Sequence, residues 1–323
     1  MRKLKVYLYF ILIGSFIFLA SCSGDFNDTT TVGIGTTVDI GTAVDVGTTV
    51  DVDTAVDVDT AKDLGMVDIY FFGFEKADAI IITTKNHTIM IDTGLNKTGK
   101  TIVEYLLRHN LTEIDYLIIT HFDNDHIGSA DRIIEELSVK EVIVPNYEKD
   151  SKQYNQFIKA LKKEELTRVI LTDIMKFTLD GTEFTLYPSE REYQDYRVEN
   201  DDDESEENNF SIAVSMNHGN NNFFFAGDAM AERTAELLAC DEIINTDYDF
   251  LKVPHHGKYN ERGVEFISAI KPKYAVITCS TDKPADDRVV AELEKNGADI
   301  FFTTDGNVYC TSDGNNINIS QHD

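Results

Sequence analysis

The chain has 323 residues, of which 42 % are hydrophobic, so it can build a sizeable core in one large domain or two smaller ones. Its formal net charge is −28, from 57 acidic and 29 basic side chains. Because this charge repels long polyanions and anionic membrane surfaces, it argues against a protein that binds long duplex DNA.

Residues 1–22 have the pattern of an export signal. A basic start at 1–5 precedes an almost wholly apolar stretch at 6–20. A stretch of this length fits a signal peptide better than a membrane-spanning helix, which needs about 20 residues. Leu19-Ala20-Ser21-Cys22 resembles a bacterial lipobox, which implies that acylated Cys22 anchors the mature protein in the cell envelope, outside the cytoplasm. The alternative is an ordinary signal peptide with an incidental cysteine.

Residues 23–65 form a low-complexity acidic segment. A six-residue unit built from Val, Asp, Gly and Thr recurs at 37–42, 43–48 and 49–54. The repeat lacks aromatic side chains and cannot bury much surface, so we interpret it as a flexible linker. A coil of about 40 residues reaches roughly 35 Å, enough to hold a domain off a membrane. A small stacked-repeat structure is the alternative.

The predicted folded domain spans 66–323, where strands alternate with helices. Strands are predicted at 67–72, 79–83, 88–91, 116–120, 141–144, 177–179, 183–187, 212–216, 222–226, 250–253, 274–278 and 299–303. Helices are predicted at 98–109, 131–137, 152–165, 231–238, 263–270 and 288–296. Turn residues at 180–181 and 217–221 join strands into two hairpins. Hairpins combined with strand–helix crossovers predict an α/β fold with two mixed sheets.

The strongest chemical signal is His121-Phe122-Asp123-Asn124-Asp125-His126, which directly follows the buried strand predicted at 116–120. Imidazole and carboxylate groups suit zinc, manganese or iron. The alternating spacing lets a looped backbone aim neighbouring ligands at two adjacent ions. The sequence therefore predicts a metal centre at the end of this strand.

This motif resembles the metallo-β-lactamase signature, commonly His-x-His-x-Asp-His, with Asp123 replacing the middle histidine. The same replacement occurs in the subfamily that resembles the C-terminal nuclease-like domain of ComEC-type competence proteins. Further matching stretches are Ile91-Asp92-Thr93-Gly94, Asn208-Asn209-Phe210-Ser211, Ala226-Gly227-Asp228, Val253-Pro254-His255-His256-Gly257, Lys271-Pro272-Lys273-Tyr274 and residues 308–314. The resemblance implies a four-layer αββα sandwich of two mixed sheets and a metal-dependent hydrolase.

The resemblance also implies two divalent ions, with zinc favoured and manganese as the alternative. The implied ligands are His121, Asp123, Asp125, His126, Asp228 and one of His255 and His256. Adjacent side chains of an extended backbone point in opposite directions, so we expect only one of this pair to ligate. We favour His256 as the ligand and place His255 near the substrate.

Other residues are assigned supporting roles by the same resemblance. Asp92 is implied to orient a ligand, and a purely structural turn role is the alternative. Asn209 and Ser211 occupy the subfamily motif in the region where the superfamily usually has a third histidine for the first ion. We therefore expect the first ion to bind more weakly, or only together with substrate.

Two adjacent ions can activate a water and stabilise both oxygens of an in-line phosphoryl displacement, with Asp125 placed to accept a proton. The predicted function is therefore an exported, lipid-anchored phosphodiesterase for a small phosphodiester or a short oligonucleotide. One alternative is a hydrolase of a non-phosphate ester or amide, among which β-lactam hydrolysis is weaker. Another is a non-catalytic envelope binding or scaffold protein with a degenerate site.

Two further features are interpreted without a functional role. Cys240, Cys279 and Cys310 match no zinc motif and are an odd number, so we read them as small buried residues rather than a disulfide framework. The acidic run at 199–207 is read as a solvated loop, with a calcium-binding loop as the alternative.

Overall fold

The computed structural model describes residues 64–191 and 207–322. The described residues all belong to one compact unit, 60–323. The predicted signal peptide and lipobox, nearly all of the predicted linker and most of the acidic run therefore lie outside the described residues. Among the described helices, none combines the length and the apolar character that crossing a membrane requires.

The first sheet has eight strands in the order β15-β14-β1-β2-β3-β4-β5-β6. Its strands are β1 (Val67–Phe71), β2 (Ile80–Thr83), β3 (Thr88–Ile91), β4 (Glu113–Ile118), β5 (Ser138–Pro145), β6 (Arg168–Leu171), β14 (Asn307–Ser312) and β15 (Ile317–His322). Strands β3 to β6 pair in parallel, and the other neighbours pair antiparallel. The sheet is therefore mixed, as predicted.

The second sheet has seven strands in the order β13-β12-β11-β10-β9-β8-β7. Its strands are β7 (Met175–Leu179), β8 (Thr182–Tyr187), β9 (Ala213–His218), β10 (Asn221–Phe225), β11 (Phe250–Lys252), β12 (Tyr274–Ile277) and β13 (Asp299–Phe302). Strands β7 to β10 pair antiparallel and β10 to β13 in parallel. Both predicted hairpins, β7–β8 and β9–β10, are confirmed.

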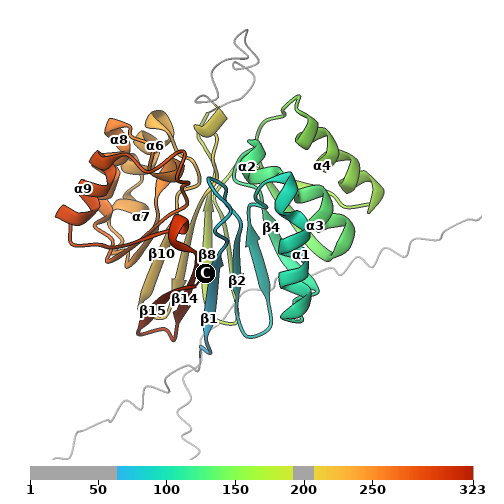
Figure 1. Ribbon diagram of the computed structural model, residues 1–323, viewed down its shortest axis with the longest axis horizontal. Coiled ribbons are helices and arrows are strands. Elements are labelled where there is room, and N and C mark those ends of the chain that lie inside the picture. Colours follow the sequence, from blue (N-terminus) through green and yellow to red (C-terminus); the bar gives the residue numbers. More distant parts are fainter. Residues whose placement is uncertain (1–63, 192–206, 323) are drawn as a thin grey trace, which may run out of the picture. The chain divides into compact units, whose positions relative to one another are not determined.

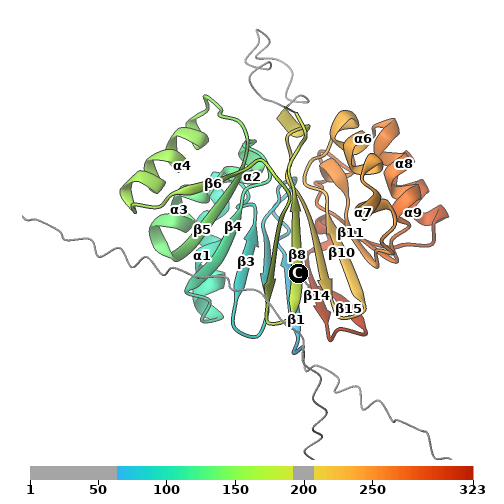
Figure 2. The same cartoon turned by 180° about the vertical axis from the view of Figure 1, so that it is seen from behind.

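Helices cover the outer faces of both sheets (Figures 1 and 2). On the first sheet lie α1 (Gly99–Arg108), α3 (Ala130–Glu136) and α4 (Lys152–Lys163). On the second lie α6 (Ala231–Ala239), α7 (Asp241–Ile244), α8 (Glu261–Ile270) and α9 (Asp287–Lys295). This arrangement confirms the predicted four-layer αββα sandwich.

Strand β10 shows how the sequence builds these layers. Phe223 and Phe225 belong to the apolar cluster between the two sheets, whereas Phe224 belongs to the cluster under the helices. All three are buried, because side chains alternate between the two faces of a strand and both faces of this sheet are covered. Burying each ring contributes about 1.5–3 kcal/mol, which explains the uninterrupted apolar run.

Several elements differ from the predictions. Strand β4 ends at Ile118 rather than at residue 120, because the backbone N–H of Thr120 donates to the Asp92 carboxylate, 2.8 Å away, instead of to a neighbouring strand. Strands β6, β14 and β15 were not predicted, since β6 and β15 keep most of their residues partly exposed and β14 alternates half-buried polar positions with buried ones. The short helices α2 (Asn124–Ile127) and α7 were also missed.

The three cysteines of the described chain are free, and Cys279 and Cys310 are buried while Cys240 is half-buried. This agrees with the prediction of small packing residues.

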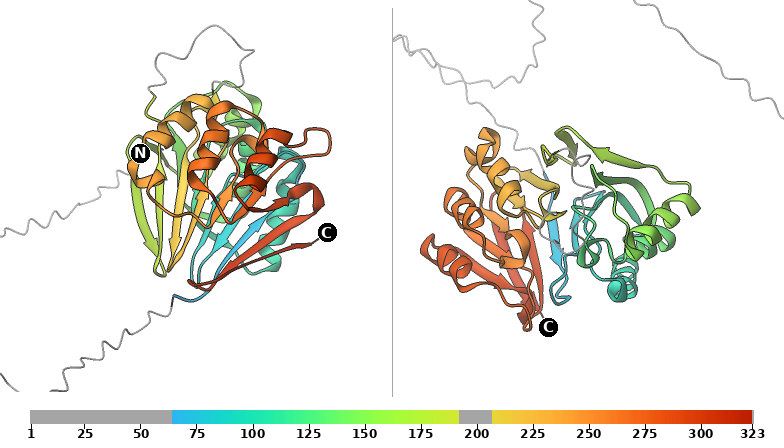
Figure 3. Two further views of the ribbon diagram at one scale, coloured as in Figure 1. Left: turned by 90° about the vertical axis from the view of Figure 1, so that its left-hand side faces the viewer. Right: turned by 90° about the horizontal axis from the view of Figure 1, so that it is seen from above.

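The fold brings four loops together at one end of the sandwich. Residues 92–94 follow β3, 121–126 follow β4, 226–228 follow β10 and 253–256 follow β11. Viewed from above, the ends of both sheets meet between the two helical layers (Figure 3). Since the carboxyl ends of parallel strands meet at one edge, motifs more than 130 residues apart become neighbours.

Candidate metal centre

The His121–His126 motif leaves β4 and turns into the short helix α2. His121 and His126 are fully buried, and their ring centroids lie 4.0 Å apart. The side chains of Asp123 and Asp125 are each 16 % exposed and so reach the surface of a cleft. Two imidazoles thus form the floor of the site, and two carboxylates form its rim.

Residues from both sheets form four overlapping groups of possible ligand atoms within the described part of the chain, and two of these groups include Asp78. Atoms of His121, His126 and Asp228 all lie within 4.8 Å of one another, as do atoms of Asp125, His126 and His256. The Asp228 Oδ2 atom lies 3.3 Å from His126 Nε2 and 2.8 Å from His256 Nε2. Asp228 therefore lies within reach of both His126 and His256, and its carboxylate would be available to a divalent ion held beside either ring.

His121 carries the clearest sign that the site fits a cation. Its Nε2 atom is buried and has no hydrogen-bond partner among the described residues, while its Nδ1 lies 3.0 Å from the Thr120 hydroxyl. An unpartnered buried polar atom costs about 1–3 kcal/mol, which a ligated ion would offset. Burial, reinforced by His126, holds the pKa of His121 well below its usual range, so the ring stays in the neutral, ligating form.

Asp92 fixes the orientation of His126. Its Oδ2 lies 2.8 Å from His126 Nδ1 and accepts from the Thr120 hydroxyl at 2.7 Å. Because a carboxylate only accepts hydrogen bonds when ionised, we assign the proton to Nδ1, which leaves Nε2 facing Asp228. Asp92 adopts φ 57°, in the left-handed region, so the turn is strained in the conformation that aims its side chain at the histidine.

The assumption of an extended backbone at the paired histidines is wrong. His255 and His256 have φ values of 46° and 53°, both left-handed, within the 3-10 turn η3 (Pro254–Gly257). This turn points the His256 ring at the ligand groups. His255 instead lies 3.3 Å from the Asn208 amide and 2.6 Å from the Met230 sulfur, with Nε2 4.0 Å from Asp228.

Asn209 and Ser211 support the site from behind. The Asn209 side chain accepts from the backbone N–H of Arg233 at 3.0 Å, and the Ser211 hydroxyl accepts from that of Asp228 at 3.2 Å. Buried Arg233 also donates to the Ser211 carbonyl at 2.9 Å. These bonds hold the Asp228 loop in place.

Sequence reasoning missed two central residues, Asp78 and Lys252, each about 1 % exposed. The Lys252 ammonium pairs with Asp78 Oδ2 and lies 3.3 Å from Asp228 Oδ1. Burial acts to lower the pKa of Lys252, but these carboxylates outweigh it and raise the pKa, so the side chain is a cation. Lys252 thus holds one oxygen of Asp228 and leaves Oδ2 to the histidines. The sequence did offer one sign of this role, because Lys252 is a charged residue at the end of the apolar strand β11, and lysine is rarely buried without a partner.

The sequence of residues 72–280, more than half of the chain, matches the family model of the metallo-beta-lactamase superfamily. The chain belongs to the metallo-β-lactamase superfamily. This membership confirms the prediction of a metal-dependent hydrolase and implies divalent ions. The imidazole and carboxylate groups around His126 and Asp228 are a donor set that fits such ions.

Two curated relatives confirm the predicted resemblance to ComEC-type competence proteins. ComE operon protein 3 of Bacillus subtilis is 26 % identical over 181 residues, which cover 55 % of this chain and 22 % of that protein. Recombination protein 2 of Haemophilus influenzae is 24 % identical over 211 residues, which cover 64 % of this chain and 23 % of that protein. The chain therefore spans less than a quarter of the length of either relative.

Solved structures of the superfamily also resemble the chain. The metallo-beta-lactamase fold protein YhfI from Bacillus subtilis has a TM-score of 0.49 at 10 % identity, covering 73 % of this chain and 96 % of that one. Tm1679, described as a metal-dependent hydrolase of the beta-lactamase superfamily, has a TM-score of 0.49 at 12 % identity, covering 73 % and 95 %.

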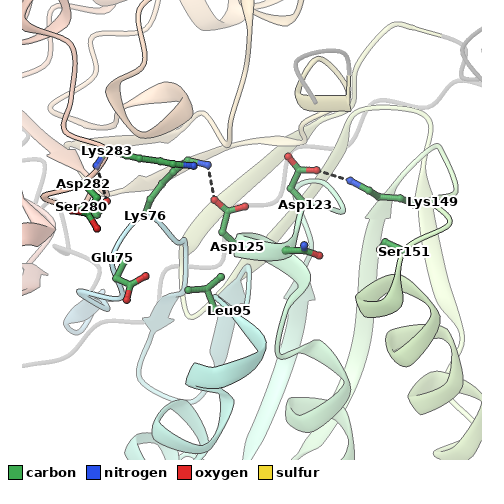
Figure 4. A pocket seen from close by; sticks show the side chains of 11 residues that line it. Glu75, Lys76, Leu95, Asp123, Asp125, Lys149, Ser151, Ser280, Asp282 and Lys283 are labelled. Atoms are coloured by element: carbon green, nitrogen blue, oxygen red, sulfur yellow. Dashed lines mark hydrogen bonds and ion pairs between the residues drawn. The ribbon is translucent and has the colours of Figure 1, made fainter. Parts of the chain in front are cut away.

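In this superfamily member, lysines line the cleft over the ligand groups (Figure 4). Lys76 Nζ lies 2.7 Å from Asp125 Oδ2, and Lys149 Nζ lies 2.7 Å from Asp123 Oδ1 and 2.6 Å from Glu207. Burial acts to raise the pKa of Asp125, but His126, His256 and Lys76 outweigh it and lower the pKa, so this carboxyl is ionised. The cleft lining therefore combines lysines with carboxylates, and Lys76 and Lys149 are each paired with an aspartate.

Proposed function

We propose that the protein is an exported, lipid-anchored phosphodiesterase that acts on small phosphodiesters or short oligonucleotides. The observation that carries this proposal is the lysine-lined cleft over the ligand groups, with Lys76 and Lys149 at its mouth. Ammonium groups beside a site for divalent ions favour an anionic substrate over a neutral ester or amide. The net charge of −28 favours a short substrate over long duplex DNA.

The arrangement assigns each side chain a task. A divalent pair, when bound, supplies Lewis-acid activation of water and neutralises charge on a phosphoryl group. His121, His126, Asp228 and His256 would hold the ions, with Asp123 and Asp125 completing the two sets at the cleft. Asp125, ionised and partly exposed, is placed to accept a proton from water.

His255 is proposed to contact the substrate rather than an ion. Burial lowers its pKa to about 4, so the ring is neutral at physiological pH. It lines the cavity on the other side of His256 together with Lys258 and Tyr259. A neutral imidazole there can donate or accept a hydrogen bond with a substrate oxygen.

The first ion is proposed to bind more weakly than the second. Asn209 and Ser211 stand in the region where the superfamily usually has a third histidine for this ion. The Asp123 carboxylate lies 3.7 Å from His121 Nε2 and is engaged by Lys149. Zinc suits the imidazole-rich donors best, and manganese is the alternative.

One of the two curated relatives is named Recombination protein 2, which supports a nucleic-acid phosphodiester as the substrate class. Anchoring through Cys22 would place the site outside the cytoplasm, where only short fragments or small diesters need be bound. The membrane is then a partner through the lipid anchor alone.

Metal analysis and assay of bis-p-nitrophenyl phosphate test the function. We expect bound zinc or manganese, turnover that EDTA abolishes, and a loss of about 100-fold or more in kcat/KM for Asp125→Ala, in line with a general base. The matched control is Asp299→Ala, an exposed aspartate of β13. A metal-free, inactive wild type would support the scaffold alternative, and turnover of p-nitrophenyl acetate alone would support the non-phosphate alternative.

A further inference from the structure

We propose that Lys76, Lys258 and Lys283 form an anion subsite beside the candidate metal centre, which binds a second phosphate group of the substrate. The inference rests on the proposed function, because it assumes that the scissile phosphodiester lies over the ligand groups. It narrows the substrate class to phosphodiesters that carry a neighbouring terminal phosphate.

Two cavities meet at this subsite. One, of about 410 Å³, is lined by Asp123, Asp125 and Lys149, and the other, of about 610 Å³, by His255 and His256. Lys76 and Lys283 line both cavities, so they stand where the two join. A substrate lying across the ligand groups from one cavity into the other must pass these ammonium groups.

The lysines come from loops of different sheets and converge on the cleft. Lys76 follows β1 of the first sheet, whereas Lys258 and Lys283 follow β11 and β12 of the second. In Figure 4 the side chains of Lys76 and Lys283 extend toward the Asp125 side of the cleft. Only the tertiary fold brings these charges together, because Lys76 and Lys283 are 207 positions apart in the sequence.

Two of the three ammonium groups at the junction have no described carboxylate within ion-pair distance. In the part of the chain that the structure describes, Lys258 and Lys283 form no ion pair, and Lys76 pairs with Asp125 alone. Nearby carboxylates are engaged elsewhere: Glu75 lies 2.8 Å from Lys97, and Asp286 lies 2.8 Å from Arg288. Asp282 and Asp287 also line the cavities, one in each, but among the described residues neither forms an ion pair with the three lysines.

Lys76 links the subsite to the ligand groups. Its ammonium and a divalent ion are attracted to the same carboxylate, that of Asp125. When an ion takes that carboxylate, Lys76 is left with Lys283 and without its counter-charge. A phosphate group, with several acceptor oxygens, satisfies such paired ammonium groups by charge-assisted hydrogen bonds.

The test compares thymidine dinucleotides with and without a terminal phosphate. Binding to the zinc-loaded full chain is measured by calorimetry, with dinucleotides in which a methylene group replaces the bridging ester oxygen so that they cannot be hydrolysed. We expect dinucleotides phosphorylated at the 5′ or the 3′ end to bind about tenfold more tightly than the unphosphorylated one, as one charge-assisted hydrogen bond predicts. Lys283→Met should remove this preference, so that phosphorylated and unphosphorylated dinucleotides bind the variant equally.

The matched control is Lys85→Met, an exposed lysine in the β2–β3 turn that lines neither cavity. It should keep the wild-type preference. Absence of any preference in wild type, or the same preference in Lys283→Met, would overturn the subsite. Failure of the proposed function is a separate result, namely that no dinucleotide with the ordinary ester oxygen is hydrolysed after zinc or manganese is added, whatever the binding preference.

Discussion

At the scale of single residues, Lys252 organises the centre. Its buried ammonium group separates the carboxylates of Asp78 and Asp228, which would otherwise repel each other away from water. By engaging Asp228 Oδ1 it also decides which oxygen of that bridging candidate faces the histidines. A methionine of similar volume would keep the packing and remove the charge.

We therefore predict that Lys252→Met destabilises the fold by about 3–5 kcal/mol, the usual cost of leaving buried charges without a partner. Urea unfolding followed by circular dichroism measures the change. Adding Asp78→Asn should recover part of the lost stability, because one of the two carboxylates left without a counter-ion is then replaced by a neutral amide. Unfolding at the wild-type urea concentration would show that Lys252 is not a structural counter-ion.

At the scale of elements, His218 ties the two sheets together at the end of β9. Its ring is fully buried, and Nδ1 lies 2.7 Å from the Ser312 hydroxyl of β14. Burial lowers the pKa of His218 below its usual value of 6.5. The contact therefore joins opposite sheets through a ring that resists protonation.

This gives a pH dependence with a defined sign. As the pH falls through about 6.5, His218 becomes protonated in the unfolded chain but stays neutral in the folded chain. The free energy of unfolding therefore decreases. Below the folded pKa the difference stays constant. We predict that His218→Asn has a flatter stability profile between pH 7 and pH 5, measured by urea unfolding. His109→Asn, an exposed position at the end of α1, serves as control and should follow wild type.

At the scale of the whole molecule, the candidate ligands join the two halves of the sandwich. His121, Asp125 and His126 follow β4 of the first sheet, whereas Asp228 and His256 follow β10 and β11 of the second. An ion held by both halves binds the folded state and not the unfolded chain. Ion binding must therefore stabilise the entire domain.

We predict that zinc at 100 times its dissociation constant raises the free energy of unfolding by about 2.7 kcal/mol, and that EDTA reverses this. Denaturant unfolding with and without zinc measures the effect. Asp228→Asn should abolish most of the zinc-dependent shift, while Asp299→Asn should retain it. A shift of equal size in Asp228→Asn would place the ion elsewhere.

The sequence by itself determined the strand and helix periodicity, both hairpins and the resemblance that implied the four-layer fold. It also marked the polar ligand types after β4, because such residues rarely follow a buried strand without a reason. The tertiary structure decided which distant groups meet. It placed Asp78 and Lys252 beside Asp228, gave His255 and His256 left-handed backbones, and gathered Lys76, Lys258 and Lys283 at one cleft. Periodicity indicates which face of a helix or strand is buried. Distances between side chains from different elements depend on how the two sheets pack, and a local sequence pattern does not contain that information.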